Sequence, residues 1–167
     1  KSGGPGDFNA MALAPLLRRG YTIFPVYHVS QPEATVMEIV DDMHRAVRWI
    51  RTHAADYGID PARIGVTGGS AGGHLALTLL THGDDGDATA ADPVDRQPSR
   101  ATLGILCYPV VSMLASNTHG GSRRNLLGDD PSEALVRELS GELAVNEATP
   151  PVFVWHTVED KAVKLEG

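Results

Sequence analysis

Residues 63–80 decide the fold, because the stretch RIGVTGGSAGGHLALTLL changes abruptly from one kind of local structure to another. The apolar run at 64–67 predicts a short buried strand, and the leucine-rich run at 73–81 predicts a helix. Between them, Gly68-Gly69-Ser70-Ala71-Gly72 matches the pattern G-x-S-x-G. A strand, a tight glycine turn and a helix in this order are typical of a nucleophile elbow, in which a serine hydroxyl projects from the end of a strand.

The glycines around Ser70 have a physical reason in such a turn. The serine adopts a strained backbone conformation, and side chains two positions before and after it would collide with the strand and the helix. We therefore expect Gly68 and Gly72 to be the positions where a Cβ atom does not fit. The amide of Ala71, at the start of the helix, is then free to stabilise a developing oxyanion. A tight turn with an incidental serine is the alternative. A phosphate cradle is disfavoured, because the stretch lacks G-x-G-x-x-G and the Walker lysine.

The segments outside the elbow alternate between helical and strand-like patterns. The strongest helical pattern covers 33–58. Its apolar residues recur at steps of three and four and form one face: Val36, Ile39, Val40, Met43, Val47 and Ile50. Further helices are expected at 8–20 and 132–140, and strands at 21–29, 101–111 and 150–158. Strands that alternate with helices at these lengths predict an α/β fold, with a mostly parallel sheet flanked by helices.

The composition limits the class of protein. The 167 residues suffice for a single domain, and 42% hydrophobic with 21% charged residues is typical of a globular chain. The net charge of −7 disfavours nucleic acid or an anionic membrane surface as a partner. No apolar run reaches the ~20 residues of a membrane-spanning helix. The single cysteine, Cys107, excludes an internal disulfide and is expected in the core. Cellular location and oligomeric state stay open.

The acidic segment 82–99 is predicted to be a surface loop rather than a metal site. It reads HGDDGDATAADPVDRQPS and is rich in residues that favour turns. Its aspartates lack the ligand spacing and the closing glutamate of a calcium-binding EF-hand loop. The sequence therefore predicts no bound metal.

A candidate acid follows the last predicted strand. A serine needs a base and an orienting acid before it acts as a nucleophile, and elbow folds carry them in the order serine, acid, histidine. Asp160 stands in that place after 150–158, with Glu159 beside it. An ordinary surface carboxylate at a strand end is the alternative reading of Asp160.

Four segments together resemble one family. They are DMHRAVRWIRTHAADYGIDPARIGVTGGSAGGHLAL (42–77), YPVVSM (108–113), THGGSRRNLLG (118–128) and PPVFVWHTVEDKAV (150–163). Over most of 21–163 the chain resembles the α/β-hydrolase esterases of the acetylxylan-esterase and feruloyl-esterase-like group. The resemblance implies a partial α/β-hydrolase fold, with Ser70 as nucleophile and Asp160 as triad acid. It also implies the removal of acetyl or similar acyl groups, often from carbohydrates, without a cofactor.

The resemblance assigns further positions near the site. It places SGGPGDF (2–8) at the family's glycine-rich oxyanion loop, which makes Gly3 and Gly4 candidate donors beside Ala71. The match there is partial, since Lys1 and Ser2 stand where the family has histidine. The resemblance implies a structural role for His74. HGG at 119–121 is expected to be a loop, because it lies after the elbow.

The chain departs from the family at both ends, and we expect it to be truncated there. The family's catalytic histidine follows the acid, but none of the seven residues after Asp160 is a histidine. His156 precedes the acid and is expected to be a strand-end residue rather than a substitute base. The final residues, 164–167, resemble a cloning remnant. The family also has a strand that would lie before Lys1, between the strands expected at 21–29 and 64–67. Without it, those two strands either separate or pair directly.

The resulting expectation is a carboxylic-ester hydrolase that deacylates a small-molecule or carbohydrate ester through Ser70, in a chain that lacks the triad histidine. A peptidase or thioesterase of the same fold is the nearest alternative chemistry, because the elbow does not define the acyl pocket. A non-catalytic pseudoenzyme that keeps the fold for binding is an alternative from another class. A second chain that completes the sheet and the triad is a further one.

Overall fold

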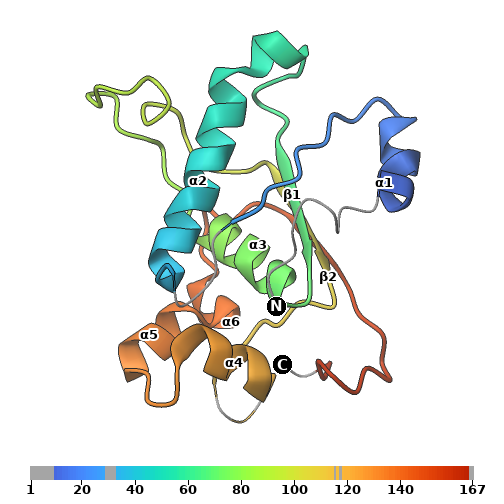
Figure 1. The fold of residues 1–167 in the computed structure, drawn as a ribbon, viewed down its shortest axis with the longest axis vertical. Coiled ribbons are helices and arrows are strands. Elements are labelled where there is room, and N and C mark those ends of the chain that lie inside the picture. The colour runs from blue at the N-terminus through green and yellow to red at the C-terminus, as the bar shows by residue number, and fades with distance from the viewer. Residues whose placement is uncertain (1–9, 29–32, 115, 117, 166–167) are drawn as a thin grey trace.

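A parallel sheet organises the chain in the computed structural model, which describes residues 10–28, 33–114, 116 and 118–165 (Figure 1). Its described strands are β1 (Gly65–Gly69), β2 (Leu103–Cys107) and β3 (Val152–Trp155), paired in that order and all parallel. Helix α3 (Ala71–Thr81) connects β1 to β2. Three helices lie between β2 and β3: α4 (Gly120–Leu127), α5 (Glu133–Glu138) and α6 (Gly141–Ala144). The predicted α/β class is therefore confirmed.

One face of the sheet carries the main core. Helix α3 packs on β1 and β2, and α2 (Val36–Thr52) packs on α3 in turn (Figure 1). Leu106 of β2 points into this layer and is 1% exposed. On the opposite face, the register partners Ile105 and Phe153 are 39% and 64% exposed. The sheet is thus covered far more completely on the α3 side.

A second apolar cluster contains residues that follow the strands rather than belong to them. Its fully or nearly buried members are Val36, Val110, Met113, Val136, Leu139 and Val163. Val110 comes shortly after β2 and Val163 after β3. The chain segments that leave the carboxyl ends of these two strands are therefore anchored in the same cluster.

Helix α2 forms where the sequence predicts the strongest helix, with a break near its end. Its N-cap is Thr35, whose hydroxyl accepts from the amide of Glu38, while the Glu38 carboxylate accepts from the amide of Thr35 at 2.7 Å. This capping box satisfies two amides that a helix end leaves free. The helix ends at Thr52, and a short 3-10 turn (Ala54–Tyr57) leads to Gly58, whose φ is +62°. Of the expected apolar face, all but Met43 is buried.

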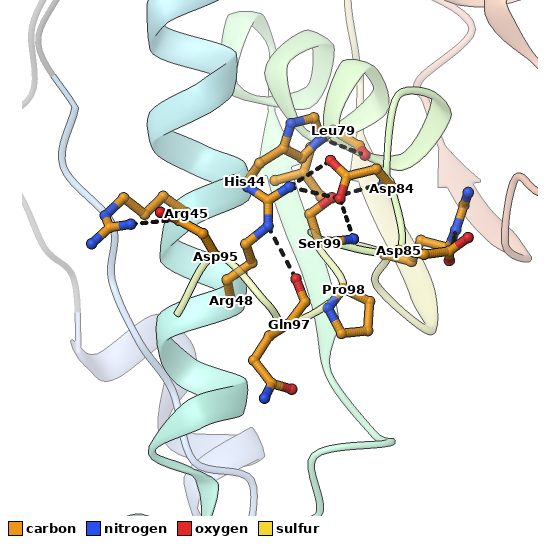
Figure 2. Close-up of polar contacts among 12 residues, drawn as sticks. His44, Arg45, Arg48, Leu79, Asp84, Asp85, Asp95, Gln97, Pro98 and Ser99 are labelled. Atoms are coloured by element: carbon orange, nitrogen blue, oxygen red, sulfur yellow. Dashed lines mark hydrogen bonds and ion pairs between the residues drawn. The ribbon is translucent and has the colours of Figure 1, made fainter. Parts of the chain in front are cut away.

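The segment 82–99 contains no helix or strand and is tied along α2, where Figure 1 shows it as the yellow-green chain beside that helix. Three arginines, one turn apart on α2, hold it, and Figure 2 shows the first two, Arg45 and Arg48. Arg45 pairs with Asp92 and Asp95, and Arg48 pairs with Asp84. Arg51 donates to the carbonyls of Pro98 and Arg100. This segment therefore has a defined path although it lacks regular secondary structure.

Two expectations about local structure are wrong. The described residues 21–28 form no strand, and β1 has β2 as its one described partner, so the predicted strands at 21–29 and 64–67 do not pair with each other. Pro25 has no amide hydrogen to donate, and Tyr21 is 60% exposed, so little holds this segment to a sheet. The segment 119–121 is not a loop. It starts α4, because the ring of His119 caps the helix by accepting from the Ser122 amide.

The remaining helix and strand predictions are confirmed in outline. Helix α1 (Ala10–Leu17) lies within the predicted 8–20, and α5 begins after the N-cap Ser132 within the predicted 132–140. The strands at 101–111 and 150–158 are shorter than expected. Within the described ranges, no helix combines the length and the apolar character needed to cross a bilayer.

Candidate active site

Ser70 lies at a sharp bend between β1 and α3. Its backbone angles are φ +55° and ψ −124°, which is unusual for any residue other than glycine. The strand ends at Gly69 and the helix begins at Ala71, so a single residue makes the connection. This is the strand–turn–helix geometry that the sequence predicts for 64–81.

The crowding around this bend differs from the expected pattern in one respect. A Cβ atom on Gly68 would lie 2.1 Å from the carbonyl oxygen of Gly72, so Gly68 is required as expected. A Cβ atom on Gly72 would meet nothing within 4 Å, which contradicts the expected role of this residue. Gly73 takes that role, because its Cβ atom would lie 2.8 Å from the Cβ atom of Pro109. The helix turns Gly72 outward and Gly73 toward the segment that follows β2.

Backbone hydrogen bonds hold Ser70 on both sides. Its amide donates to the carbonyl of Cys107 at 3.0 Å. Its carbonyl accepts from the amide of His74 at 3.1 Å and from the amide of Val110 at 3.3 Å. Ala71 is exposed and is the first residue of α3, where helix amides have no partner within the helix. Its N–H is therefore available to a negatively charged oxygen close to Ser70.

His74 has a structural position one turn into α3. Its side chain is buried, and Nε2 donates to the carbonyl of Leu139 at 2.7 Å. Burial lowers the pKa of His74 below its ordinary value, which favours the neutral ring. The ring thus joins α3 to the end of α5 and is occupied by that bond, in line with the role that the family resemblance implies.

Asp160 lies in a turn that follows β3. Its Oδ1 accepts from the amides of Ala162 at 2.8 Å and Val163 at 3.0 Å. The bond from the Val163 amide, followed by the bond from the Ala162 amide, holds the pKa of Asp160 below its ordinary value, and electrostatic interactions with the His156 and His119 side chains act in the same direction. Asp160 is therefore a carboxylate at neutral pH, and its Oδ2 is left to a further partner.

His156 and His119 are the histidines near this carboxylate, and both rings are engaged. The side chain of His156 is 8% exposed, and its Nε2 donates to the carbonyl of Val163 at 2.8 Å, while Oδ2 of Asp160 lies 3.7 Å away. His119 uses Nδ1 to cap α4. His156 closes the turn that carries Asp160, as expected for a strand-end residue.

Ser70 and Asp160 follow the carboxyl ends of two strands in one parallel sheet, with β2 between them. Carboxyl ends of parallel strands meet at one edge, where ligands of open α/β sheets bind. Glu159 is exposed, and nothing in the described contacts draws it into this region. Gly3 and Gly4, the candidate donors of the oxyanion loop, lie outside the described residues.

Sequence reasoning did not find Tyr108, which sits directly after β2. Its φ is +37°, and its hydroxyl oxygen would lie 3.2 Å from a Cβ atom on Gly69. Its ring meets that of Trp155 edge-on, with centroids 5.3 Å apart. The sequence signal was the dipeptide Tyr108-Pro109, which indicates a turn or extended backbone but not a left-handed residue.

Comparison with known proteins gives one family match. The BD-FAE family model matches residues 2–167. Among curated proteins, the chain is 33% identical over 166 residues to endo-1,4-beta-xylanase B of Butyrivibrio fibrisolvens, covering 94% of this chain and 25% of that protein. It is 30% identical over 154 residues to the acetylxylan esterase of Xylanibacter ruminicola, covering 90% of this chain and 29% of that protein.

Solved structures give the same picture. The acetyl ester-xyloside bifunctional hydrolase from Caldicellulosiruptor lactoaceticus is 44% identical, with a TM-score of 0.78, over 81% of this chain and 49% of that one. The truncated form of a carbohydrate esterase from gut microbiota is 26% identical, with a TM-score of 0.77, over 91% of this chain and 60% of that one. The chain therefore spans less than two thirds of the length of each of these four relatives.

Proposed function

Because the chain belongs to the BD-FAE family, we propose that it carries the nucleophile and the acid of a serine esterase that deacylates carbohydrate-type esters. Relatives at 30% and 44% identity carry the names acetylxylan esterase and acetyl ester-xyloside bifunctional hydrolase. The observation that supports the proposal most directly is the backbone of Ser70, with φ +55° at the single residue between β1 and α3. A strained serine between a strand and a helix of an α/β sheet is the backbone geometry of a nucleophile elbow, which supports the proposed role of Ser70.

In the proposed reaction, Oγ of Ser70 attacks the ester carbonyl while a base takes the hydroxyl proton. The amide of Ala71 and an amide of Gly3 or Gly4 stabilise the oxyanion of the tetrahedral intermediate. Collapse of the intermediate expels the alcohol, which takes up the proton, and leaves an acyl-serine. Water, deprotonated by the same base, then releases the carboxylic acid and restores Ser70.

The base in this proposal is an imidazole that Asp160 orients but that this sequence does not supply. The histidine nitrogen near Oδ2 of Asp160 is Nε2 of His156, which lies 3.7 Å away in the same turn. His156 is nearly buried and bonded to the Val163 carbonyl, and His74 is buried and bonded to the Leu139 carbonyl. Nε2 of each ring donates that bond, so Nδ1 is the atom that could take a proton, and no described contact joins either Nδ1 to the Ser70 hydroxyl. Loss of a triad member lowers the rate by about 10⁴- to 10⁶-fold, so slow hydrolysis is expected of the 167 residues alone.

Chemical rescue tests this assignment. Hydrolysis of an acetylated xylo-oligosaccharide is measured with and without added imidazole, in the native chain and in Ser70→Ala. The expected result is a rate that rises with imidazole in the native chain and stays at the imidazole-only background in Ser70→Ala. Equal rates in both proteins at all imidazole concentrations would overturn the role of Ser70.

A second outcome of the same experiment bears on the base. If the native chain hydrolysed the ester at a full esterase rate without imidazole, and Ser70→Ala abolished it, a histidine of this chain would be the base. His156→Gln would then be the first variant to test, because His156 is the ring adjacent to Asp160. That outcome would overturn the external base while leaving the nucleophile in place.

A further inference from the structure

The described residues contain two non-glycine residues with positive φ, Ser70 and Tyr108. They follow neighbouring strands directly, because Gly69 and Cys107 are register partners in β1 and β2. A bulky aromatic residue with positive φ is a genuine backbone outlier, and such outliers persist only where the surroundings impose them. The coincidence of two outliers side by side calls for a physical reason.

The backbone contacts of the segment around Tyr108 supply that reason. The residue before it, Cys107, accepts from the Ser70 amide at 3.0 Å. Val110, two residues after it, donates to the Ser70 carbonyl at 3.3 Å. In a regular parallel ladder the amide and the carbonyl of one residue bind partners two positions apart on the neighbouring strand, whereas Cys107 and Val110 lie three positions apart, so the segment holds one extra residue at this point. The turn at Tyr108 bends the chain so that Cys107 binds the peptide unit before Ser70 and Val110 binds the peptide unit after it.

Tyr108 also faces the strand that leads to the candidate acid. Its own amide donates to the carbonyl of Trp155 at 2.8 Å, and Trp155 is the last residue of β3. Asp160 lies five residues further on, in the turn whose Val163 is buried against the same apolar cluster as Val110. One residue thus joins the bend at Ser70 to the strand that carries Asp160.

Packing fixes this conformation from both sides. The Tyr108 hydroxyl lies against Gly69, where any side chain would be crowded, and its ring meets Trp155 at an interplanar angle of 80°. The next residue, Pro109, is fully buried and lies against Gly73. The left-handed backbone at 108 is therefore held by the buried Pro109 that follows it and by the contact of the Tyr108 side chain with Gly69.

We propose that Tyr108 is a positioning residue of the esterase site: its left-handed backbone holds the peptide units of Ser70 and sets the place of Ser70 relative to the Asp160 turn. The inference rests on the proposed function only in taking Ser70 as the nucleophile. Tyr108 itself needs no contact with substrate in this role.

Three substitutions separate the backbone conformation from the side chain. Tyr108→Gly removes the ring but adopts positive φ freely, whereas Tyr108→Val keeps an apolar side chain whose branched Cβ opposes positive φ. Tyr108→Phe removes only the hydroxyl. If the backbone carries the role, the glycine and phenylalanine variants keep the elbow and the valine variant loses it, although glycine is the larger deletion.

Amide hydrogen exchange measures the strength of the backbone hydrogen bonds around Ser70 without any need for catalysis. In Tyr108→Val, the amides of Ser70 and Val110 are expected to exchange about 10-fold faster or more, relative to the α2 amide of Val47, which reports global unfolding. In Tyr108→Gly and Tyr108→Phe, the same ratio is expected to change by less than about threefold. Equal loss of protection at Ser70 and Val47 in the valine variant, or a greater loss in the glycine variant, would overturn the inference.

The rescued esterase reaction gives the second readout. Tyr108→Val is expected to lower kcat by about 10- to 100-fold at unchanged KM, because misplacement of a nucleophile costs rate rather than ground-state binding. Tyr108→Gly is expected to retain kcat within about threefold. A rise in KM with constant kcat would instead make Tyr108 a substrate-binding residue and overturn the positioning role. Failure of Ser70→Ala to affect the rate would overturn the proposed function and leave the exchange result standing.

Discussion

Arg48 contacts both carboxylate oxygens of Asp84 through Nη2, at 2.6 and 2.5 Å (Figure 2). The same side chain uses Nε to donate to the carbonyl of Gln97 at 3.1 Å. Asp84 stands near the start of the segment 82–99 and Gln97 near its end. Arg48, whose side chain is only 17% exposed, therefore ties both ends of this long irregular segment to α2.

Arg48→Gln is expected to lower the free energy of unfolding by about 1–3 kcal/mol, because Asp84 loses its charged donor at a partly buried place. Trypsin is expected to cut faster after Arg96, which lies inside the same segment. Urea unfolding and timed proteolysis measure the two effects.

Arg45→Gln is the matched control for this variant. Arg45 binds two aspartates of the same segment, but its side chain is 48% exposed, and exposed ion pairs contribute little. A loss of stability in Arg45→Gln as large as that in Arg48→Gln would contradict the special place of Arg48.

Alanine substitutions at Gly68 and Gly72, the glycines two positions before and after Ser70, are expected to have opposite effects on stability. Gly68→Ala brings a Cβ atom to 2.1 Å from the Gly72 carbonyl oxygen and should cost about 1–3 kcal/mol through overpacking. Gly72→Ala places a methyl group in open space on α3, where alanine is favoured over glycine by up to about 1 kcal/mol. Thermal unfolding of both variants decides the matter, and a destabilised Gly72→Ala would refute the assignment.

The stability of the chain is expected to fall as the pH drops below about 6.5, the ordinary pKa of histidine. Burial lowers the pKa of His44 and of His74, so the unfolded chain binds protons at a pH where the folded chain does not. This contribution is fully present above the unfolded pKa and is lost as the pH falls through the folded pKa. The slope amounts to at most about 1.4 kcal/mol per pH unit for each ring.

Urea unfolding at pH 7.5 and 5.5 tests the origin of that slope. His74→Gln keeps an N–H donor for the Leu139 carbonyl and removes the titrating ring, so the slope should decrease. His44→Gln does the same for the contact of His44 with the Leu79 carbonyl. An unchanged slope in both variants would exclude these two rings as its source.

Asp160 can be changed so that its charge and its turn are tested separately. An asparagine at 160 still offers Oδ1 to the amides of Ala162 and Val163, whereas a leucine offers nothing. Amide exchange at 162 and 163 should stay slow in Asp160→Asn and accelerate by about tenfold or more in Asp160→Leu. Asp160→Asn should nevertheless reduce the imidazole-rescued hydrolysis. Rescue at the native rate in that variant would remove Asp160 from the proposed site.

The elements that the sequence predicts well are those whose structure is determined by residues close to one another in the chain. The periodic apolar face of α2, the helix predicted at 132–140 and the bend at Ser70 are local signals, and the structure confirms each of them. The segment 21–28 has strand-like composition but no strand, since a strand depends on a partner that local composition does not reveal. Helix α4 was missed because its cap is the ring of His119, which is an uncommon N-cap.

The candidate site likewise contains residues that local sequence signals predict and residues that only the fold reveals. Ser70 and Asp160 are recognisable from chain order and neighbouring elements, and the structure places both after carboxyl ends of the sheet. Tyr108 is not recognisable, because its role comes from a positive φ and from bonds to β1 and β3 that only the fold brings together. Gly73 is hidden for a related reason, since its crowding comes from Pro109, 36 positions later in the chain.

A search for comparable bends in other chains would gain from this arrangement. The pentapeptide used for such searches includes position 72, which tolerates a side chain sterically, and omits position 73, which does not. A query of the form G-x-S-x-x-G describes the spatial demand of this fold more closely. A randomised library built on the chain could likewise vary position 72 freely and should hold 68 and 73 fixed.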